Sequence, residues 1–266
     1  MSTFTAPLPF TEAMQSREIR SILRTTGNTA DLATLEPAVR ERAIFSATVT
    51  SAELLDGVDR RVQGILAGQL DQATARLGLK QILADMGYTA DPAVAGSLQD
   101  LRTDERLNLI IETNVDLARG YGQWVQGQDA AVLDEWPARE LIRVRASKVP
   151  RDWAQRWTEA GGQFFDGRMI ALVNDPIWTR ISRFGLPYAP YDFGSGMDQH
   201  DVERAEAVAI GLLDESTVLL PQSRDFNADL KASPVVRSNW LIDALESSGV
   251  GEFNDAGVFV FKGGVL

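Results

Sequence analysis

The chain has 266 residues, 44% of them hydrophobic, so it can bury a substantial core as one large domain or two smaller ones. Its formal net charge of -11 argues against non-specific binding to nucleic acid, which depends on clustered Lys and Arg that displace counterions from phosphates. The absence of cysteine excludes disulfides and thiolate metal sites and fits a reducing cytoplasm, and no apolar run is long enough to span a membrane. We therefore expect a soluble globular protein that binds neither nucleic acid nor membranes.

The N-terminal half predicts helices. Residues 1–10 carry Pro7 and Pro9 among small residues and predict an extended N-terminal arm. Over 11–136 the apolar residues recur at three- and four-residue steps, which is typical of amphipathic helices packed in a bundle. The first expected helix begins at a capping-box pattern formed by Thr50 and Glu53 and ends at Gly68. The second covers 70–86 and ends at Gly87, and the third covers 106–124.

After Pro137 shorter segments are divided by proline and glycine, so residues 137–266 predict a smaller mixed α/β region. Trp153 and Trp157, four residues apart, are expected in its core. The predicted strands are 141–146, 169–173 and 258–262, and the predicted helices are 152–160, 176–184, 198–213 and 239–247. The fold class is therefore α+β, with a predominantly helical N-terminal bundle followed by this mixed region.

One amide interrupts the apolar face of the helix expected over 106–124. Asn114 shares that face with Leu107, Ile110, Ile111, Leu117, Ala118, Tyr121 and Val125. Burying an amide costs roughly 1 to 3 kcal/mol unless it is hydrogen-bonded. We therefore predict that Asn114 is buried and has a fixed hydrogen-bond partner, inside the fold or on another protein.

The same segment resembles the core motif of the phage head morphogenesis proteins, the Mu F-like minor head proteins. The motif corresponds here to Leu109, Ile110, Thr113, Asn114, Ala118, Gly120 and Tyr121. The likeness extends into residues 41–68 and 171–213 and covers well over half of the chain. Members of that family carry a Cys-x-Cys pair near the end of the domain, and this chain has no cysteine, which excludes any role of that pair here.

The resemblance implies a structural minor head protein that associates with the portal vertex during procapsid assembly. Its partners would be the portal protein and, as further candidates, the major capsid protein and other copies of this chain. It would need no cofactor or metal, and it would be located in the virion and, during assembly, in the host cytoplasm. Two alternatives remain: a head-to-tail connector or adaptor, and a small hydrolase or ADP-ribosyltransferase-type enzyme in the C-terminal half.

A catalytic site would have to start from His200, the only histidine, which lies near Ser195, Asp198 and Asp201. The sequence around Ser195 lacks the G-x-S-x-G nucleophile elbow, and the GGQFFDGR stretch lacks the Lys and Ser/Thr of a phosphate loop. The two aspartates and His200 lie at a spacing that does not place all three on one helical face. We predict that Asp198 caps a helix, that the chain has no catalytic or metal site, and that it is not an enzyme.

The segment 185–197 contains two prolines, three glycines and several aromatic rings, which predicts an ordered but irregular loop. Loops display residues on the surface, and tyrosines supply large contact areas in interfaces at low entropy cost. Tyr188, Tyr191 and Phe193 are therefore the candidate partner-binding residues.

Overall fold

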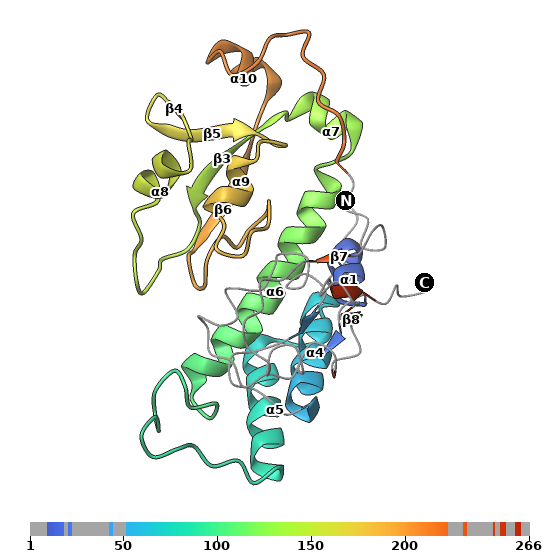
Figure 1. The fold of residues 1–266 in the computed structure, drawn as a ribbon, viewed down its shortest axis with the longest axis vertical. Coiled ribbons are helices and arrows are strands. Elements are labelled where there is room, and N and C mark those ends of the chain that lie inside the picture. Colours follow the sequence, from blue (N-terminus) through green and yellow to red (C-terminus); the bar gives the residue numbers. More distant parts are fainter. Residues whose placement is uncertain are drawn as a thin grey trace, which may run out of the picture. The chain divides into compact units, whose positions relative to one another are not determined.

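The chain forms two compact units. The structure, a computed structural model, describes residues 10–18, 21–22, 43–44, 52–222, 231–232, 247, 251–253 and 259–261. The helical unit consists of residues 1–118 and 225–266, and the sheet unit consists of residues 119–224 (Figure 1). The boundary between them falls inside helix α6 (Asp104–Gln126).

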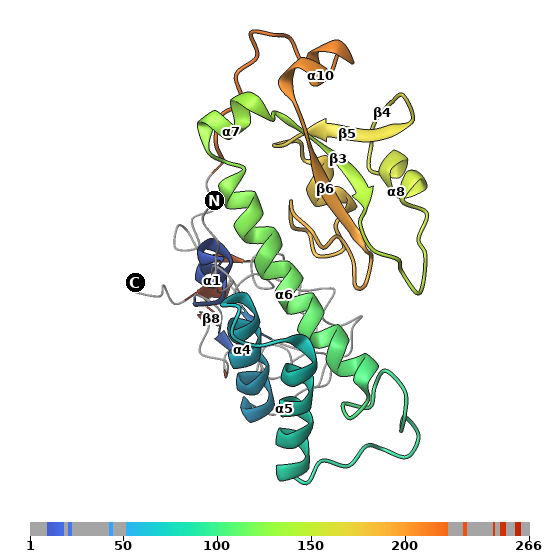
Figure 2. The same cartoon turned by 180° about the vertical axis from the view of Figure 1, so that it is seen from behind.

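The helical unit is built around α1 (Thr11–Glu18), α4 (Ala52–Leu66), α5 (Gln72–Asp85) and the first part of α6, as the apolar spacing predicts. Helices α4 and α5 lie side by side in both views (Figures 1 and 2). Their apolar faces form one core with the stripe on α6, and the core residues include Leu54, Leu55, Val58, Val62, Leu79, Leu83, Leu107, Ile111 and Val115.

The ends of α5 show how the local sequence defines a helix. Asp71 adopts an extended backbone before the helix and its carboxylate accepts a hydrogen bond from Thr74 N at 3.0 Å. At the other end Gly87 has φ of +65°, a left-handed conformation that favours glycine and stops the helix. Gly68, with φ of +70°, follows α4 in the same way, so both predicted stop signals are confirmed.

Among the described residues of the helical unit there are also five short strands. Strand β1 (Ser21–Ile22) pairs in parallel with β2 (Ala43–Ile44). Strands β7 (Lys231–Ala232), β9 (Phe259–Phe261) and β8 (Gly251–Phe253) form an antiparallel sheet in that order. Strand β9 confirms the strand predicted over 258–262. The predicted arm 1–10, apart from Phe10, and the predicted helix 239–247, apart from Ser247, lie outside the described residues.

The sheet unit contains a four-stranded antiparallel sheet of order β4-β5-β3-β6. Its strands are β3 (Ala138–Arg143), β4 (Phe164–Phe165), β5 (Arg168–Leu172) and β6 (Met197–Val202). Short helices precede, connect or follow them: α7 (Ala130–Glu135), α8 (Trp153–Glu159), α9 (Ile177–Ile181) and α10 (Arg204–Ala209). The fold is thus a helical N-terminal region followed by a mixed α/β region, as the sequence predicts.

Each face of this sheet packs on its own apolar cluster. On one face Leu141, Ala171 and Met197 contact the tryptophans of α8 and α9, and Trp153, Trp157 and Trp178 are all buried. On the other face Ala138, Ile170 and Val202 pack against Ala207 of α10. The alternation of side chains along each strand explains this division, since neighbouring residues point to opposite faces.

The helix predicted over 198–213 is wrong in its first half. Residues 197–202 form β6, which pairs along its whole length with β3, and only Arg204–Ala209 is helical. The polar run of β6 has no helical apolar stripe of its own, and its strand conformation depends on hydrogen bonding to a segment some sixty residues earlier in the chain. Among the helices that the structure describes, none is both long and apolar enough to cross a membrane.

Candidate functional site

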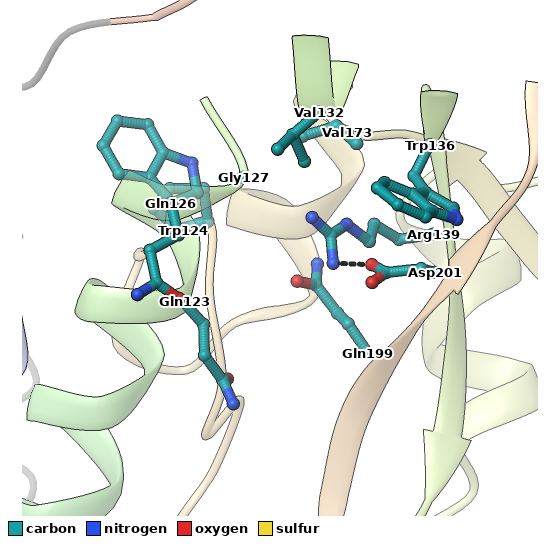
Figure 3. Close-up of a pocket in the computed structure, with 11 residues that line it drawn as sticks. Gln123, Trp124, Gln126, Gly127, Val132, Trp136, Arg139, Val173, Gln199 and Asp201 are labelled. Carbon is teal, nitrogen blue, oxygen red and sulfur yellow. Dashed lines mark hydrogen bonds and ion pairs between the residues drawn. The ribbon is translucent and has the colours of Figure 1, made fainter. Parts of the chain in front are cut away.

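A pocket of about 330 Å³ opens within the sheet unit between the C-terminal turns of α6 and one end of the sheet (Figure 3). Helix α6 contributes Gln123, Trp124 and Gln126 on one side, and strands β3 and β6 contribute Arg139, Gln199 and Asp201 on the other (Figure 3). The remaining lining residues are Gly127, Val132, Trp136, Val173 and Pro187.

The register of the sheet places the charged pair of this pocket. Arg139 lies directly opposite Asp201 on neighbouring antiparallel strands, and Leu141 lies opposite Gln199. Side chains of directly opposed residues share a face, so the guanidinium of Arg139 reaches Asp201 and donates a hydrogen bond to its carboxylate (Figure 3). Burial lowers the pKa of Arg139, and the nearby Tyr191 and Asp198 oppose that change. An arginine remains protonated after such a change, so the pair stays ionic.

Gly127 lets the arginine settle against the backbone that follows α6. A Cβ atom at this position would lie 2.6 Å from an Nη atom of Arg139. Any side chain at residue 127 would therefore displace the guanidinium from its place in the pocket wall. In this structure the side chain of Arg139 occupies the space that a side chain at residue 127 would need.

The lining chemistry suits a segment of peptide. The amides of Gln123, Gln126 and Gln199 offer both donors and acceptors, which match the hydrogen-bonding groups of a polypeptide backbone. Trp136, Val132 and Val173 offer apolar surface, and the charge of Arg139 is balanced by Asp201. The pocket thus combines amides with apolar side chains and a balanced ion pair, and no lining residue is a serine, cysteine, lysine or histidine nucleophile.

The family-like motif is used structurally on α6. Ala118 is fully buried, and Tyr121 packs edge-on against Tyr188 with ring centroids 5.9 Å apart. A Cβ atom at Gly120 would lie only 1.8 Å from the carbonyl oxygen of Ala189, so the helix backbone and the 185–197 loop touch there. Three of the motif positions thus carry requirements of size or shape.

Asn114 meets its prediction only in part. Its side-chain nitrogen donates a hydrogen bond of 2.9 Å to the carbonyl oxygen of Ile110, one turn earlier in α6. The side chains of Asn114 and Thr113 are both half-buried, whereas the next residue, Val115, is buried. The expected hydrogen bond is confirmed, and the expectation of full burial is wrong because the buried stripe passes through Val115 beside Asn114.

The loop tyrosines are core residues, which corrects their selection as exposed partner-binding candidates. Tyr188 is 1% exposed and packs against Tyr121 and Trp124, and Tyr191 is fully buried against Trp153 and Trp178. Phe193 is half-buried. The proline and glycine content of the loop correctly indicates irregular backbone, but the large rings turn inward because their burial is more favourable than exposure to water.

The residues of the catalytic alternative do not form a site. Ser195 is 1% exposed and its hydroxyl accepts a hydrogen bond from Met197 N at 3.2 Å. His200 is exposed on β6, and its Nδ1 lies 3.0 Å from the carbonyl oxygen of Asp201. Asp198 lies within β6 as well, so its predicted role as a helix cap is wrong. Within the described ranges, no group of His, Asp and Glu side chains is arranged to hold a metal ion.

Sequence reasoning missed the pocket itself. Its parts come from α6, α7, β3 and β6, and the pairing of Arg139 with Asp201 depends on the unpredicted strand β6. The local sequence contained only two hints of the pocket: Trp136, which the structure leaves 36% exposed, and the glutamines on the polar side of α6. Comparison of the chain with protein-family models, with curated proteins and with solved structures found no match to any of them.

Proposed function

We propose that the chain is a phage minor head protein that associates with the portal vertex during procapsid assembly. It acts by binding and not by catalysis. The portal protein is its main partner, and the major capsid protein is a further candidate. The proposal places the protein in the virion and, during assembly, in the host cytoplasm.

The proposal rests on the segment that resembles the Mu F-like motif and on the way the fold uses it. Gly120 is the position at which a side chain would collide with Ala189, and Ala118 and Tyr121 are buried on the same helix. The motif residues thus serve to pack the fold and not to perform chemistry. We expect a family of structural assembly proteins to share residues of this kind. This use of Gly120 is the observation that carries the proposal.

The pocket beside α6 supplies a binding surface consistent with such a role. Its amides and apolar side chains suit an extended segment of another protein, and Trp136, 36% exposed, is its most accessible aromatic group. Tryptophans at the edge of concave surfaces often supply a large share of interface energy. We therefore assign the portal contact to this pocket.

The test is co-expression of the chain with the portal protein of the same phage, followed by affinity purification and quantitation of the complex. The wild-type chain should co-purify with the portal protein. Trp136→Ala should weaken the complex by roughly thirtyfold and reduce recovery accordingly, since an interface tryptophan contributes on the order of 2 kcal/mol.

Leu77→Ala is the matched control, because it also removes an exposed apolar side chain, here on α5, and should leave recovery unchanged. Thermal unfolding of both variants is measured in parallel, because Trp136 is partly covered by the fold, and reduced recovery counts as a lost contact only where the variant is folded under the conditions of the experiment. If the portal protein is not recovered with the wild-type chain, the proposed function fails. If Trp136→Ala binds normally, the contact lies elsewhere on the chain.

A further inference from the structure

Three arginines converge on one buried carboxylate in the sheet unit. Arg151 Nε and Arg156 Nη1 each lie 3.0 Å from Oδ2 of Asp192, and Arg183 Nη1 lies 3.6 Å from Oδ1. The side chain of Asp192 is 5% exposed, whereas those of the arginines are 27% to 44% exposed. One negative charge thus faces three positive charges, which leaves an excess of positive charge at the surface.

Further cations adjoin this cluster along the loop that leads from β3 to α8. Arg143 Nη1 donates a hydrogen bond of 3.0 Å to the carbonyl oxygen of Ser195, and Arg151 Nη2 donates one of 2.8 Å to that of Phe193. The 143–151 loop therefore runs along residues 192–196, and Lys148 is exposed on it. We call the surface formed by Arg143, Lys148, Arg151, Arg156 and Arg183 the arginine face.

Among the described residues the positive side chains of this face outnumber the carboxylates in contact with them. In the described part of the chain Asp192 is the carboxylate shared by three of its arginines, while Arg143 and Lys148 have no carboxylate partner. The nearby Asp152 caps α8 through a 2.8 Å hydrogen bond from Gln155 N. Such a face stands out in a chain whose formal net charge is -11.

Apolar groups are interleaved with these charges. Val144 and Val149 on the same loop are 50% and 69% exposed. The ring of Phe193 is half-buried, and the guanidinium of Arg183 lies 5.6 Å from its centroid. Arginines held over aromatic rings beside exposed aliphatic side chains are the composition of protein interfaces, where arginine is enriched.

We propose that the arginine face binds an acidic segment of a protein partner in which carboxylates alternate with apolar side chains. The carboxylates would receive paired hydrogen bonds from the guanidinium groups, and the apolar side chains would cover Val144 and Val149. A nucleic acid is the less favoured occupant, because its phosphate backbone would gain nothing from the exposed Val144 and Val149. The surface is independent of the pocket assigned to the portal contact.

The test is fluorescence anisotropy of the full chain with a labelled peptide in which glutamates alternate with valine and leucine. Three controls accompany it. The glutamine version of this peptide tests whether the carboxylates are needed, duplex DNA of equal length tests for nucleic-acid binding, and inorganic phosphate as a competitor tests whether any anion suffices. The glutamate peptide should bind, more weakly as salt rises. The double variant Lys148→Glu and Arg183→Glu should weaken its binding by about tenfold or more, since both substitutions place like charges against the peptide.

The variant leaves Arg151 and Arg156 in place on Asp192 but removes the contact of Arg183 with that carboxylate. Thermal unfolding of the variant is therefore measured beside its binding, and Lys148→Glu alone, which leaves all three arginines on Asp192, should weaken binding in the same direction. The double variant Arg60→Glu and Lys80→Glu in the helical unit makes the same change in net charge and should bind the peptide like wild type. The proposal is overturned if the glutamate peptide does not bind, if both double variants lose binding equally, or if the glutamine peptide binds as well. Binding of DNA in preference to the peptide would also overturn it.

Discussion

At the scale of single residues, Tyr191 shows how far a loop side chain can belong to the core. It is fully buried, with its ring stacked on Trp178 at a centroid distance of 6.0 Å. Burial raises its pKa well above the usual value, the charge of Asp198 raises it further, and Arg139 opposes the change. Among the described residues its hydroxyl has no hydrogen-bond partner. The ring therefore supplies the stabilisation, and the hydroxyl adds a desolvation cost.

Two substitutions at Tyr191 separate the ring from the hydroxyl. Tyr191→Phe should leave the free energy of unfolding unchanged or raise it by about 1 kcal/mol, because it removes an unsatisfied buried polar group. Tyr191→Ala should lower it by about 3 to 5 kcal/mol, because it empties a large site in the core. Chemical denaturation measures both values. A large loss in Tyr191→Phe would mean that the hydroxyl has a stabilising partner.

The raised pKa of Tyr191 also fixes the sign of an effect at alkaline pH. The folded protein holds the phenolic proton more tightly than the unfolded chain does, so the contribution is complete below the unfolded value of about 10 and is lost as pH rises above it. Tyr191→Phe should reduce that alkaline loss of stability. The burial of Tyr188 and Tyr191 could not be predicted from the sequence of their loop. Loop composition indicates an irregular backbone, whereas the burial of these rings depends on Trp124, Trp153 and Trp178, which come from distant segments.

At the scale of elements, the loop between α5 and α6 is organised by one aspartate. Asp100 is 2% exposed, accepts hydrogen bonds from Gly96 N at 3.0 Å and Arg102 N at 2.9 Å, and binds the guanidinium of Arg102 through both carboxylate oxygens. The hydrogen bonds from the Arg102 side chain, and then those from the two backbone amides, hold the pKa of Asp100 well below its usual range. An isolated loop sequence does not reveal this, because the pairing requires a specific turn.

Asp100→Asn should lower the free energy of unfolding at neutral pH. Because the folded pKa is depressed, the contribution of Asp100 is present above the unfolded value of about 3.9 and is lost as pH falls below it towards the folded value. The difference between wild type and variant should therefore shrink in acid, as followed by denaturation across pH. Asp91→Asn, an exposed position in the same loop, is the control for the charge change and should show a smaller effect. Equal stability of Asp100→Asn and wild type at every pH would contradict the assigned role.

Elements differ in how far their own sequence specifies them. Helices α4, α5 and α6 follow from apolar spacing with glycine or aspartate at their ends, and β3, β5, α8 and α9 follow from short apolar runs and prolines. Strand β6 does not, because its residues between Met197 and Val202 are all polar and only pairing with β3 makes them a strand. The candidate pocket depends on that pairing, so it was beyond the reach of local patterns.

At the scale of the whole molecule, composition and periodicity predicted the α+β class, with helices first and the mixed region after them. The compact units divide the chain inside α6 and join residues 225–266 to the helical unit, which no change in local composition indicates. The pocket and the arginine face both lie within the sheet unit, and both consist of recognition groups: amides, tryptophan, arginines and exposed valines. The proposed role in head assembly assigns the sheet unit to partner binding.

The measurement that tests this role most directly is the copy number of the chain in procapsids and mature heads of the phage, purified and quantified by mass spectrometry. A minor head protein at the portal vertex should be present in procapsids at a few copies per particle. The copy number in mature heads would then show whether the protein is retained or lost on maturation. Recovery as a ring of fixed stoichiometry at the head-to-tail junction would instead identify a connector. Absence from procapsids would contradict the account.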